Sequence, residues 1–232
     1  MKNLLLLSLI CFLPARLMAQ DCLGMTLKPG MGYEMQSFSA KDKPNGRMIY
    51  VVKNVRKEGQ NTVIDIEFQS LDEREKNRQP ASQIKYTCTG DELIADLSGM
   101  VTGAGQAPEN TEMKMKANKL QYPRTLAAGQ KLPDGQLEAD FYKSGSIFMA
   151  MTMQITNRLV GPNESLTTPA GTFAVNKVSA DIDMKNRVMG IGIPVSLKSV
   201  SYRAGNTIFD VRTETYNKSG KLMGYSVLSK VH

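Results

Sequence analysis

The sequence predicts an all-β protein in which consecutive strands run antiparallel. The segment "NTVIDIEF" (residues 61–68) alternates apolar and polar side chains and places Ile64, Ile66 and Phe68 on one face. This period of two is typical of a half-buried strand. Short turn sequences, such as "EGQN" at 58–61, separate segments of this kind, and strands joined by such short links must run antiparallel. No window has the period of a long amphipathic helix, so we expect few or no helices.

The N-terminal residues indicate export. Lys2 precedes an apolar run from Leu4 to Leu13, and the small residue Ala19 follows. These are the features of a secretory signal peptide. We expect cleavage after Ala19, which leaves residues 20–232 as a single β domain in the periplasm or outside the cell. The apolar run is too short to span a bilayer, and no later segment predicts a transmembrane span.

Two cysteines remain after this cleavage, Cys22 and Cys88. In an oxidising compartment we expect them to form a disulfide; two separate buried thiols are the alternative. A lipoprotein carries small residues just before its first mature cysteine. Because Asp21 precedes Cys22, the sequence disfavours lipid anchoring.

The longest alternating segment is "FMAMTMQITNRLV" (residues 148–160), which is rich in methionine. It predicts one strand face with Met149, Met151, Met153, Ile155 and Leu159, and an opposite face with Thr152, Gln154, Thr156 and Arg158. Methionine thioethers can line an adaptable apolar pocket, bind Cu(I), or simply fill a core. We predict no metal and no cofactor, because neither histidine nor a free cysteine supports a copper site. The candidate ligand-pocket residues are Met149, Met151, Met153, Ile155, Phe173 and Val175.

Two short motifs predict structural turns. In "TTPAGTF", Pro169 takes the second position of a type I turn, and Gly171 stands where a positive φ is needed. In "LPDG", Pro133 and Gly135 have the same chemistry.

The strand after Gly171 changes its apolar face part-way along. Phe173 and Val175 share one parity, and Val178 and Ala180 share the other. A β-bulge near Asn176–Lys177 would explain the change.

The residues that common enzymes need are missing. The only histidine is His232, the last residue, and chain ends are often mobile. A Ser-His-Asp triad and a histidine-based zinc site are therefore not expected. The segment "SQIK" (Ser82–Lys85) has the spacing of a serine–lysine pair, but Ile84 and Tyr86 indicate a strand, on which residues three apart point to opposite faces. We predict a protein with no catalytic residues.

The charge of the chain is basic but scattered. The formal net charge is +7, and no run of basic residues forms an arm for nucleic acid. We predict no nucleic-acid partner.

Several motifs resemble a known family. They are "CLGMTLKPGMGYEM" (22–35), "LQYPRTLAAGQKLPDG" (120–135), "MTMQITNRLVGPNESLTTPAGTF" (151–173) and "TETYNKSGKLMGYSVL" (213–228). The chain resembles the TapB-like family of bacterial (Bacteroidetes-type) envelope proteins, which is related to the DUF3108 domain. The resemblance implies a partly closed barrel, so we predict an antiparallel meander curled into a half-open β-barrel. It implies no activity and supplies no catalytic residue.

These observations favour a non-catalytic binding module for an apolar or lipid-like small molecule on a concave sheet face. The alternative is an envelope scaffold that binds a protein partner, using sheet edges or the patternless stretch Ser98–Glu112. A hydrolase is the least favoured class.

Overall fold

A computed structural model describes residues 20–74, 81–99, 111–188 and 191–232. Every element with defined bounds in these ranges is a strand. The strands are β1 (Gln20–Cys22), β2 (Met25–Leu27), β3 (Gly32–Ser39), β4 (Pro44–Glu58), β5 (Asn61–Leu71), β6 (Ser82–Cys88), β7 (Glu92–Asp96), β8 (Glu112–Pro123), β9 (Gly135–Lys143), β10 (Ser146–Thr168), β11 (Gly171–Val188), β12 (Ile191–Ala204), β13 (Asp210–Asn217) and β14 (Leu222–Val231). Within the described ranges, no helix has the length and hydrophobicity of a membrane span.

Strands β3 to β14 form a closed antiparallel barrel, and β1 and β2 form a separate small hairpin. Each barrel strand pairs with its neighbours in sequence, and the last strand, β14, pairs with the first, β3. The predicted half-open barrel is therefore wrong. Local patterns predict the meander, but they carry no information on whether its two ends pair, and here the pairing of the ends removes the open edges.

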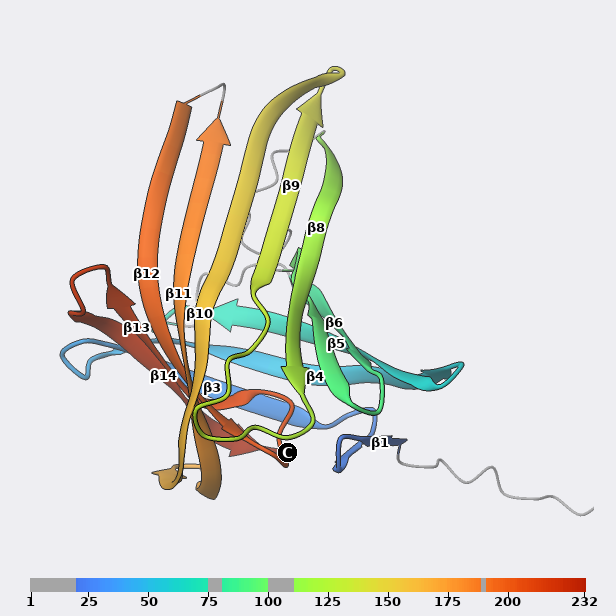
Figure 1. Cartoon of the computed structure of the whole chain (residues 1–232), viewed down its shortest axis with the longest axis vertical. Helices are drawn as coiled ribbons and strands as arrows, with labels where there is room; N and C mark the ends of the chain where they lie inside the picture. Colours follow the sequence, from blue (N-terminus) through green and yellow to red (C-terminus); the bar gives the residue numbers. More distant parts are fainter. Residues whose placement is uncertain (1–19, 75–80, 100–110, 189–190) are drawn as a thin grey trace, which may run out of the picture.

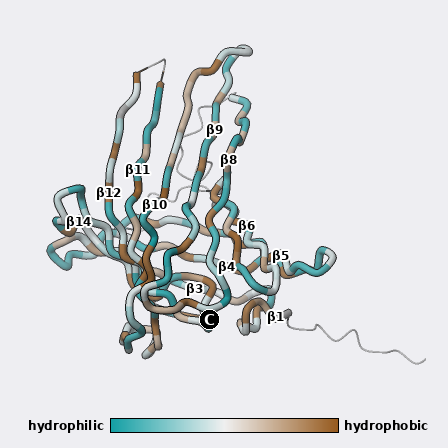
Figure 2. The backbone as a smooth tube through the Cα atoms, viewed as in Figure 1, coloured by the Kyte–Doolittle hydropathy of each residue, from teal (hydrophilic) through white to brown (hydrophobic). Residues whose placement is uncertain are grey.

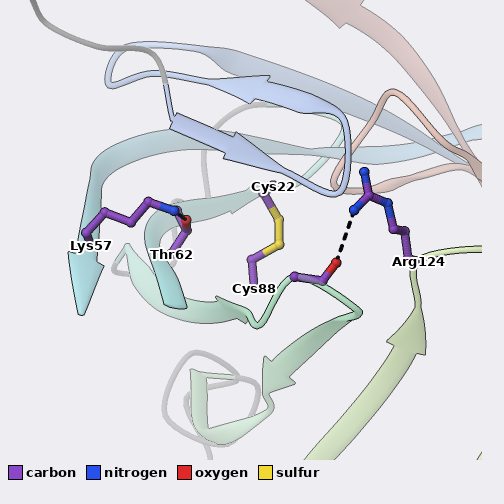
Figure 3. Close-up of a disulfide and its surroundings, with 6 residues drawn as sticks. Cys22, Lys57, Thr62, Cys88 and Arg124 are labelled. Atoms are coloured by element: carbon purple, nitrogen blue, oxygen red, sulfur yellow. Dashed lines mark hydrogen bonds between the residues drawn. A yellow bond between two sulfur atoms is a disulfide. The ribbon is translucent and has the colours of Figure 1, made fainter. Parts of the chain in front are cut away.

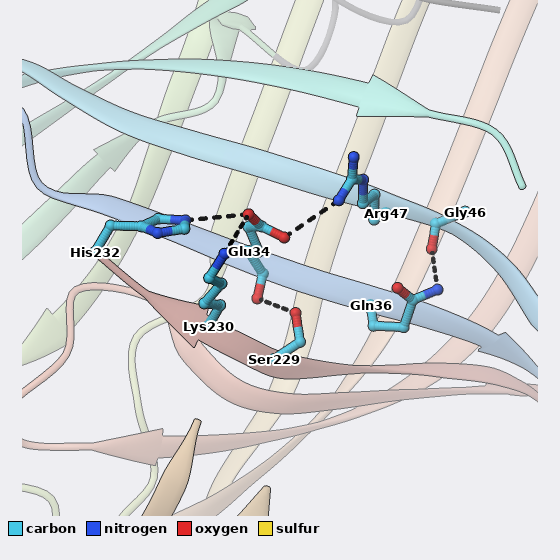
Figure 4. A network of polar contacts seen from close by, with 7 residues as sticks. All are labelled: Glu34, Gln36, Gly46, Arg47, Ser229, Lys230 and His232. Atoms are coloured by element: carbon cyan, nitrogen blue, oxygen red, sulfur yellow. Dashed lines mark hydrogen bonds and ion pairs between the residues drawn. The ribbon is translucent and has the colours of Figure 1, made fainter. Parts of the chain in front are cut away.

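The β3–β14 seam holds the C-terminus in the sheet (Figure 4). The backbone N–H of His232 donates to the carbonyl oxygen of Gly32 at 2.9 Å. Beside it, the Glu34 carboxylate lies 3.1 Å from Nε2 of His232, 4.0 Å from Nζ of Lys230 and 3.4 Å from Nη1 of Arg47. The expectation of a mobile terminus is therefore corrected: His232 is an ordered part of the seam.

The barrel is closed over only part of its height. In Figure 1, β8 to β12 rise together, whereas β3, β4, β5, β13 and β14 run across beneath them. β13 pairs with β12 only from Leu197 onward, and β7 pairs with β8 only from Leu120 onward. The five rising strands thus continue past the closed part as an extended sheet. Figure 2 shows apolar and polar residues alternating along these strands.

Two bulges bend β10, a strand of 23 residues. At the first, Asn157 and Arg158 together oppose the single residue Ala180, and Asn157 has φ +51°. The extra residue reverses the faces of the strand. Arg158 is therefore buried and Leu159 exposed, the opposite of the uninterrupted alternation that the sequence predicted.

The second bulge corrects the one expected at Asn176–Lys177. The register between β11 and β12 runs without a shift through these residues. The bulge lies in β10 instead, where Gly161 and Pro162 together oppose the single residue Lys177. Because β11 itself has no extra residue, Val175 and Val178 face opposite sides of the sheet. Val175 is buried in the large cluster of the barrel, and Val178 in a separate cluster with Leu132 and Val160.

The predicted disulfide between Cys22 and Cys88 is confirmed, with Cα atoms 5.7 Å apart (Figure 3). Both cysteines are buried. The bond ties the β1–β2 hairpin to the end of β6, and Met25 and Leu27 of that hairpin belong to the same apolar cluster as the cysteines. The hairpin is too small to be stable alone, so this covalent link holds it against the barrel.

We predict that Gly171→Val lowers the free energy of unfolding by about 1–3 kcal/mol. Gly171 closes the β10–β11 hairpin opposite Thr168 and has φ +135°, a conformation that a β-branched residue adopts only with strain. Urea denaturation measures the change. Ser165→Ala, at an exposed position of the same hairpin, is the control and should be nearly neutral; an equally neutral Gly171→Val would contradict this account of the turn.

Candidate functional site

The loop between β12 and β13 folds into the barrel. β12 ends at Ala204 and β13 begins at Asp210, so residues 205–209 connect the two strands. Thr207, Ile208 and Phe209 are buried, and the hydroxyl of Thr207 donates to the carbonyl oxygen of Phe209 at 2.7 Å. This side-chain bond satisfies a backbone group outside the ladder, which stabilises the inserted loop.

Phe209 is the centre of an aromatic cluster inside the barrel. Its ring centroid lies 4.3 Å from that of Tyr50, 5.2 Å from that of Tyr33 and 6.2 Å from that of Tyr86. The Tyr33 and Tyr86 rings meet it edge-on, a favourable geometry for aromatic pairs. The loop is thus held by strands from the opposite wall.

A cavity of about 540 Å³ lies beside this cluster. Most of its wall is apolar or aromatic, with one charged pair. The side chains that define its chemistry are Met35, Met48, Phe68, Ile84 and Leu120, the tyrosines Tyr50, Tyr86 and Tyr122, and the pair Arg203 and Asp210. This volume and this mixture are typical of small-molecule sites.

The charged pair has a defined geometry. Nη1 of Arg203 lies 2.6 Å from Oδ1 of Asp210, and the hydroxyl of Thr213 donates to Oδ2 of the same carboxylate at 3.3 Å. The guanidinium of Arg203 also stacks on the ring of Tyr122, 3.8 Å from its centroid. Asp210 and Tyr122 therefore fix the position of Arg203 in the wall.

A second guanidinium shares the Tyr122 ring. Arg158, turned inward by the first bulge of β10, lies 4.6 Å from the ring centroid. It donates from Nη1 to the carbonyl oxygens of Gln121 and Pro133, and its Nη2 has no hydrogen-bond partner among the described residues. These bonds hold the β8–β9 connection against β10 without an acidic partner.

The surroundings shift the pKa of several groups in this wall. Burial, and then the charge of Asp210, raises the pKa of Tyr50 to about 12. Burial also raises the pKa of Tyr86. For Arg203, burial acts to lower the pKa, but the Asp210 carboxylate more than offsets it, so that the pKa is raised. At neutral pH the cavity therefore has neutral phenols and a charged guanidinium.

The structure brings most of the predicted pocket residues together, but away from this cavity. Met149, Met151, Met153 and Ile155 are buried side by side in a cluster with β9. Val175 is buried in the other large cluster, with Phe173 packed against it. None of the six lines the cavity, and their role in ligand binding stays a prediction.

The second predicted turn has another role. The carbonyl oxygen of Pro133 accepts the bond from Arg158. Gly135 is the first residue of β9, and a Cβ at this position would lie 2.8 Å from Leu120 and 3.2 Å from Ile155. "LPDG" therefore leads from the β8–β9 connection into a crowded strand start.

Other features of the chain offer no metal or serine–lysine site in the described part. No group of three or more His, Cys, Asp or Glu residues there could hold a metal ion. Ser82 and Lys85 lie on strand β6, as the alternation predicted. Residues 100–110 of the patternless stretch lie outside the described residues.

The sequence analysis missed the residues of the cavity. Tyr122, Arg203, Phe209 and Asp210 are absent from the predicted site residues. One signal was present: in "RAGNTIFD" the turn residues Gly205 and Asn206 interrupt the segment. Turn chemistry at that point is incompatible with a continuous strand.

Comparison with known protein families identifies the family of this chain. The DUF3108-like family profile matches residues 28–228. The chain belongs to the DUF3108-like family. A search of curated proteins found no match.

Two crystal structures share the fold. A candidate lipoprotein from Parabacteroides distasonis has a TM-score of 0.70 and 22% identity, over 92% of this chain and 100% of its own. A candidate exported protein with a YmcC-like fold from Bacteroides fragilis has a TM-score of 0.66 and 18% identity, over 88% of this chain and 96% of its own. The first of these proteins is described as a lipoprotein and the second as an exported protein. The predicted signal peptide of this chain, residues 1–19, lies outside the described residues.

We predict that the protein loses stability as the pH rises from about 10 to about 12. In the unfolded chain Tyr50 ionises near its ordinary pKa of 10.0, whereas in the folded chain its pKa is about 12. Its contribution to stability is complete below pH 10 and is lost as the pH passes through the folded pKa.

Urea denaturation at a series of pH values measures this loss. Tyr50→Phe removes the titrating group and should flatten the decline, whereas Tyr142→Phe, which lies outside the cavity beside Lys114, is the control. Equal declines in the wild-type protein and in Tyr50→Phe would show that Tyr50 is not shielded as described.

Proposed function

We propose that this protein is a TapB-like envelope protein that is exported and acts as a non-catalytic binding module for an apolar or lipid-like small molecule. The observation that carries the proposal is the cavity of about 540 Å³ inside the barrel, with its apolar and aromatic wall. Its size falls within the range of small-molecule sites.

The composition of the wall supports an apolar ligand. Met35, Met48 and Phe68 supply flexible or flat apolar surfaces, and methionine adapts to ligands of irregular shape. The raised pKa of Tyr50 keeps its hydroxyl neutral, so this part of the wall carries no charge that would disfavour an alkyl chain. The described relatives, one called exported and the other a lipoprotein, support an envelope location.

Partner binding is the second candidate, and the far end of the extended sheet favours it. Val188 and Ile191 pair across β11 and β12 and are 41% and 75% exposed, and Val195 on the same face is 42% exposed. Exposed apolar groups on one face are typical of contact surfaces. We favour the cavity because most barrel strands contribute to its lining and because it combines apolar walls with a few placed polar groups.

The test fills the cavity from its wall. Ile84 of β6 lines it, and Ile84→Trp adds a ring where a ligand would lie. We expect the purified protein to bind laurate or its neutral ester monolaurin, and Ile84→Trp to weaken that binding by about tenfold or more. Native mass spectrometry and calorimetry measure the binding.

Ile147→Trp is the matched control, because Ile147 is 54% exposed and lies outside this cavity. A second variant, Ser226→Phe, fills the cavity from β14, and circular dichroism checks that each variant is folded. If neither lipid binds the wild-type protein, or if folded Ile84→Trp and Ser226→Phe bind as the control does, the proposed function is wrong.

A further inference from the structure

A second pocket, of about 210 Å³, lies next to the cavity. Tyr122 and Arg203 line both, so the two spaces adjoin at these side chains. Among its other lining residues are Arg124, Asn176 and Thr207. We name this the arginine pocket.

The charges around the arginine pocket are positive. Two guanidinium side chains, Arg124 and Arg203, line it, and no Asp or Glu does so within the described residues. Asp210, which pairs with Arg203, lines the cavity on the other side. Arg158 adds a third guanidinium against the shared Tyr122 ring. Arg158 and Arg203 thus lie against this ring, and Arg124 lines the arginine pocket.

The donors of these arginines are only partly used. Arg203 donates from Nη1 to Asp210, which leaves further N–H groups of its planar fork for an anion. Arg124 is exposed, and its Nη1 reaches the carbonyl oxygen of Gly90 at 3.4 Å, a long bond (Figure 3). Its backbone N–H donates to the carbonyl oxygen of Asp91 at 2.6 Å, so the main chain that carries it is fixed next to the disulfide-linked hairpin.

We infer that the arginine pocket binds the anionic head group, a carboxylate or a phosphate, of an amphiphile whose apolar part occupies the barrel cavity. The inference rests on the proposed function and deepens it. Two guanidinium groups without an acid are the arrangement that recognises planar or tetrahedral oxyanions. Because the two spaces adjoin at Tyr122 and Arg203, one molecule can place a charged head in the arginine pocket and an apolar tail in the cavity.

Asp210 then competes with the ligand for Arg203. A head-group oxygen at Arg203 adds a second anion to a guanidinium already paired at 2.6 Å. Removing the competing carboxylate should therefore strengthen anion binding, whereas removing the guanidinium should weaken it.

The experiment compares laurate with monolaurin, which has the same acyl chain and a neutral head, both below the concentrations at which they form micelles. For the purified wild-type protein we expect laurate to bind about tenfold tighter than monolaurin, and this advantage to shrink as salt is added. Arg124→Gln should remove most of the advantage without changing monolaurin binding. Asp210→Asn, checked for folding by circular dichroism, should increase the affinity for laurate relative to that for monolaurin.

Arg187→Gln is the matched control, because Arg187 is exposed on β11 and lines neither the cavity nor the arginine pocket. Arg124 is itself exposed, so its substitution is expected to leave the protein folded, and circular dichroism checks this. Inorganic phosphate is titrated separately, to distinguish a lipid head group from a free anion.

Three other outcomes would overturn the head-group proposal, the proposed function or both. Equal affinities for laurate and monolaurin, unchanged by Arg124→Gln, overturn the anionic head group and leave the proposed function standing. Binding of phosphate that Arg124→Gln abolishes, with no binding of either amphiphile, overturns the link to the cavity. No binding of any probe overturns both proposals.

Discussion

The interior of the barrel depends on the loop that β12 and β13 send into it. Phe209, the last residue of this loop, meets three tyrosine rings. Arg203 and Asp210, on the strands that flank the loop, pair with each other. Aromatic contacts and a mostly buried ion pair thus fix the same loop from both sides. Leaving a buried guanidinium without its acid would cost folding free energy in such surroundings. The Arg203–Asp210 pair therefore stabilises the fold and also fixes the position of the charge on the cavity wall.

The barrel around this loop is a meander in which each strand pairs with its neighbours in sequence, and bulges interrupt its longest strand. The bulges of β10 let one strand bend over the height of the molecule, and the first of them turns Arg158 toward the Tyr122 ring. The disulfide joins the N-terminal hairpin to the barrel. Pairing of β3 with β14 then closes the sheet. Arg158 and Arg203 both lie at register shifts of their strands, where the regular alternation that sends polar side chains outward is interrupted.

The sequence predicts the local features of this structure well. The antiparallel strands, the Cys22–Cys88 bond and the strand nature of Ser82–Lys85 all follow from short-range patterns. The closure of the barrel could not be predicted in this way, because it depends on a pairing between the two ends of the chain. The bulge at Asn157 could not be located from the alternation, because Leu159 and Val160 beyond it are both apolar and either could face inward. One inserted residue reverses every side chain beyond it, and the inward position of Arg158 was missed for that reason. The cavity was missed for a related reason: its residues come from nine barrel strands and the inserted loop, and no short window contains more than a few of them.

The most direct test of the account is a crystal structure of the protein grown with laurate. The account predicts an acyl chain beside Tyr50 and Phe209 inside the barrel, with its carboxylate on Arg203 and Arg124. A cavity filled by side chains of the protein, or laurate bound elsewhere on the molecule, would contradict it.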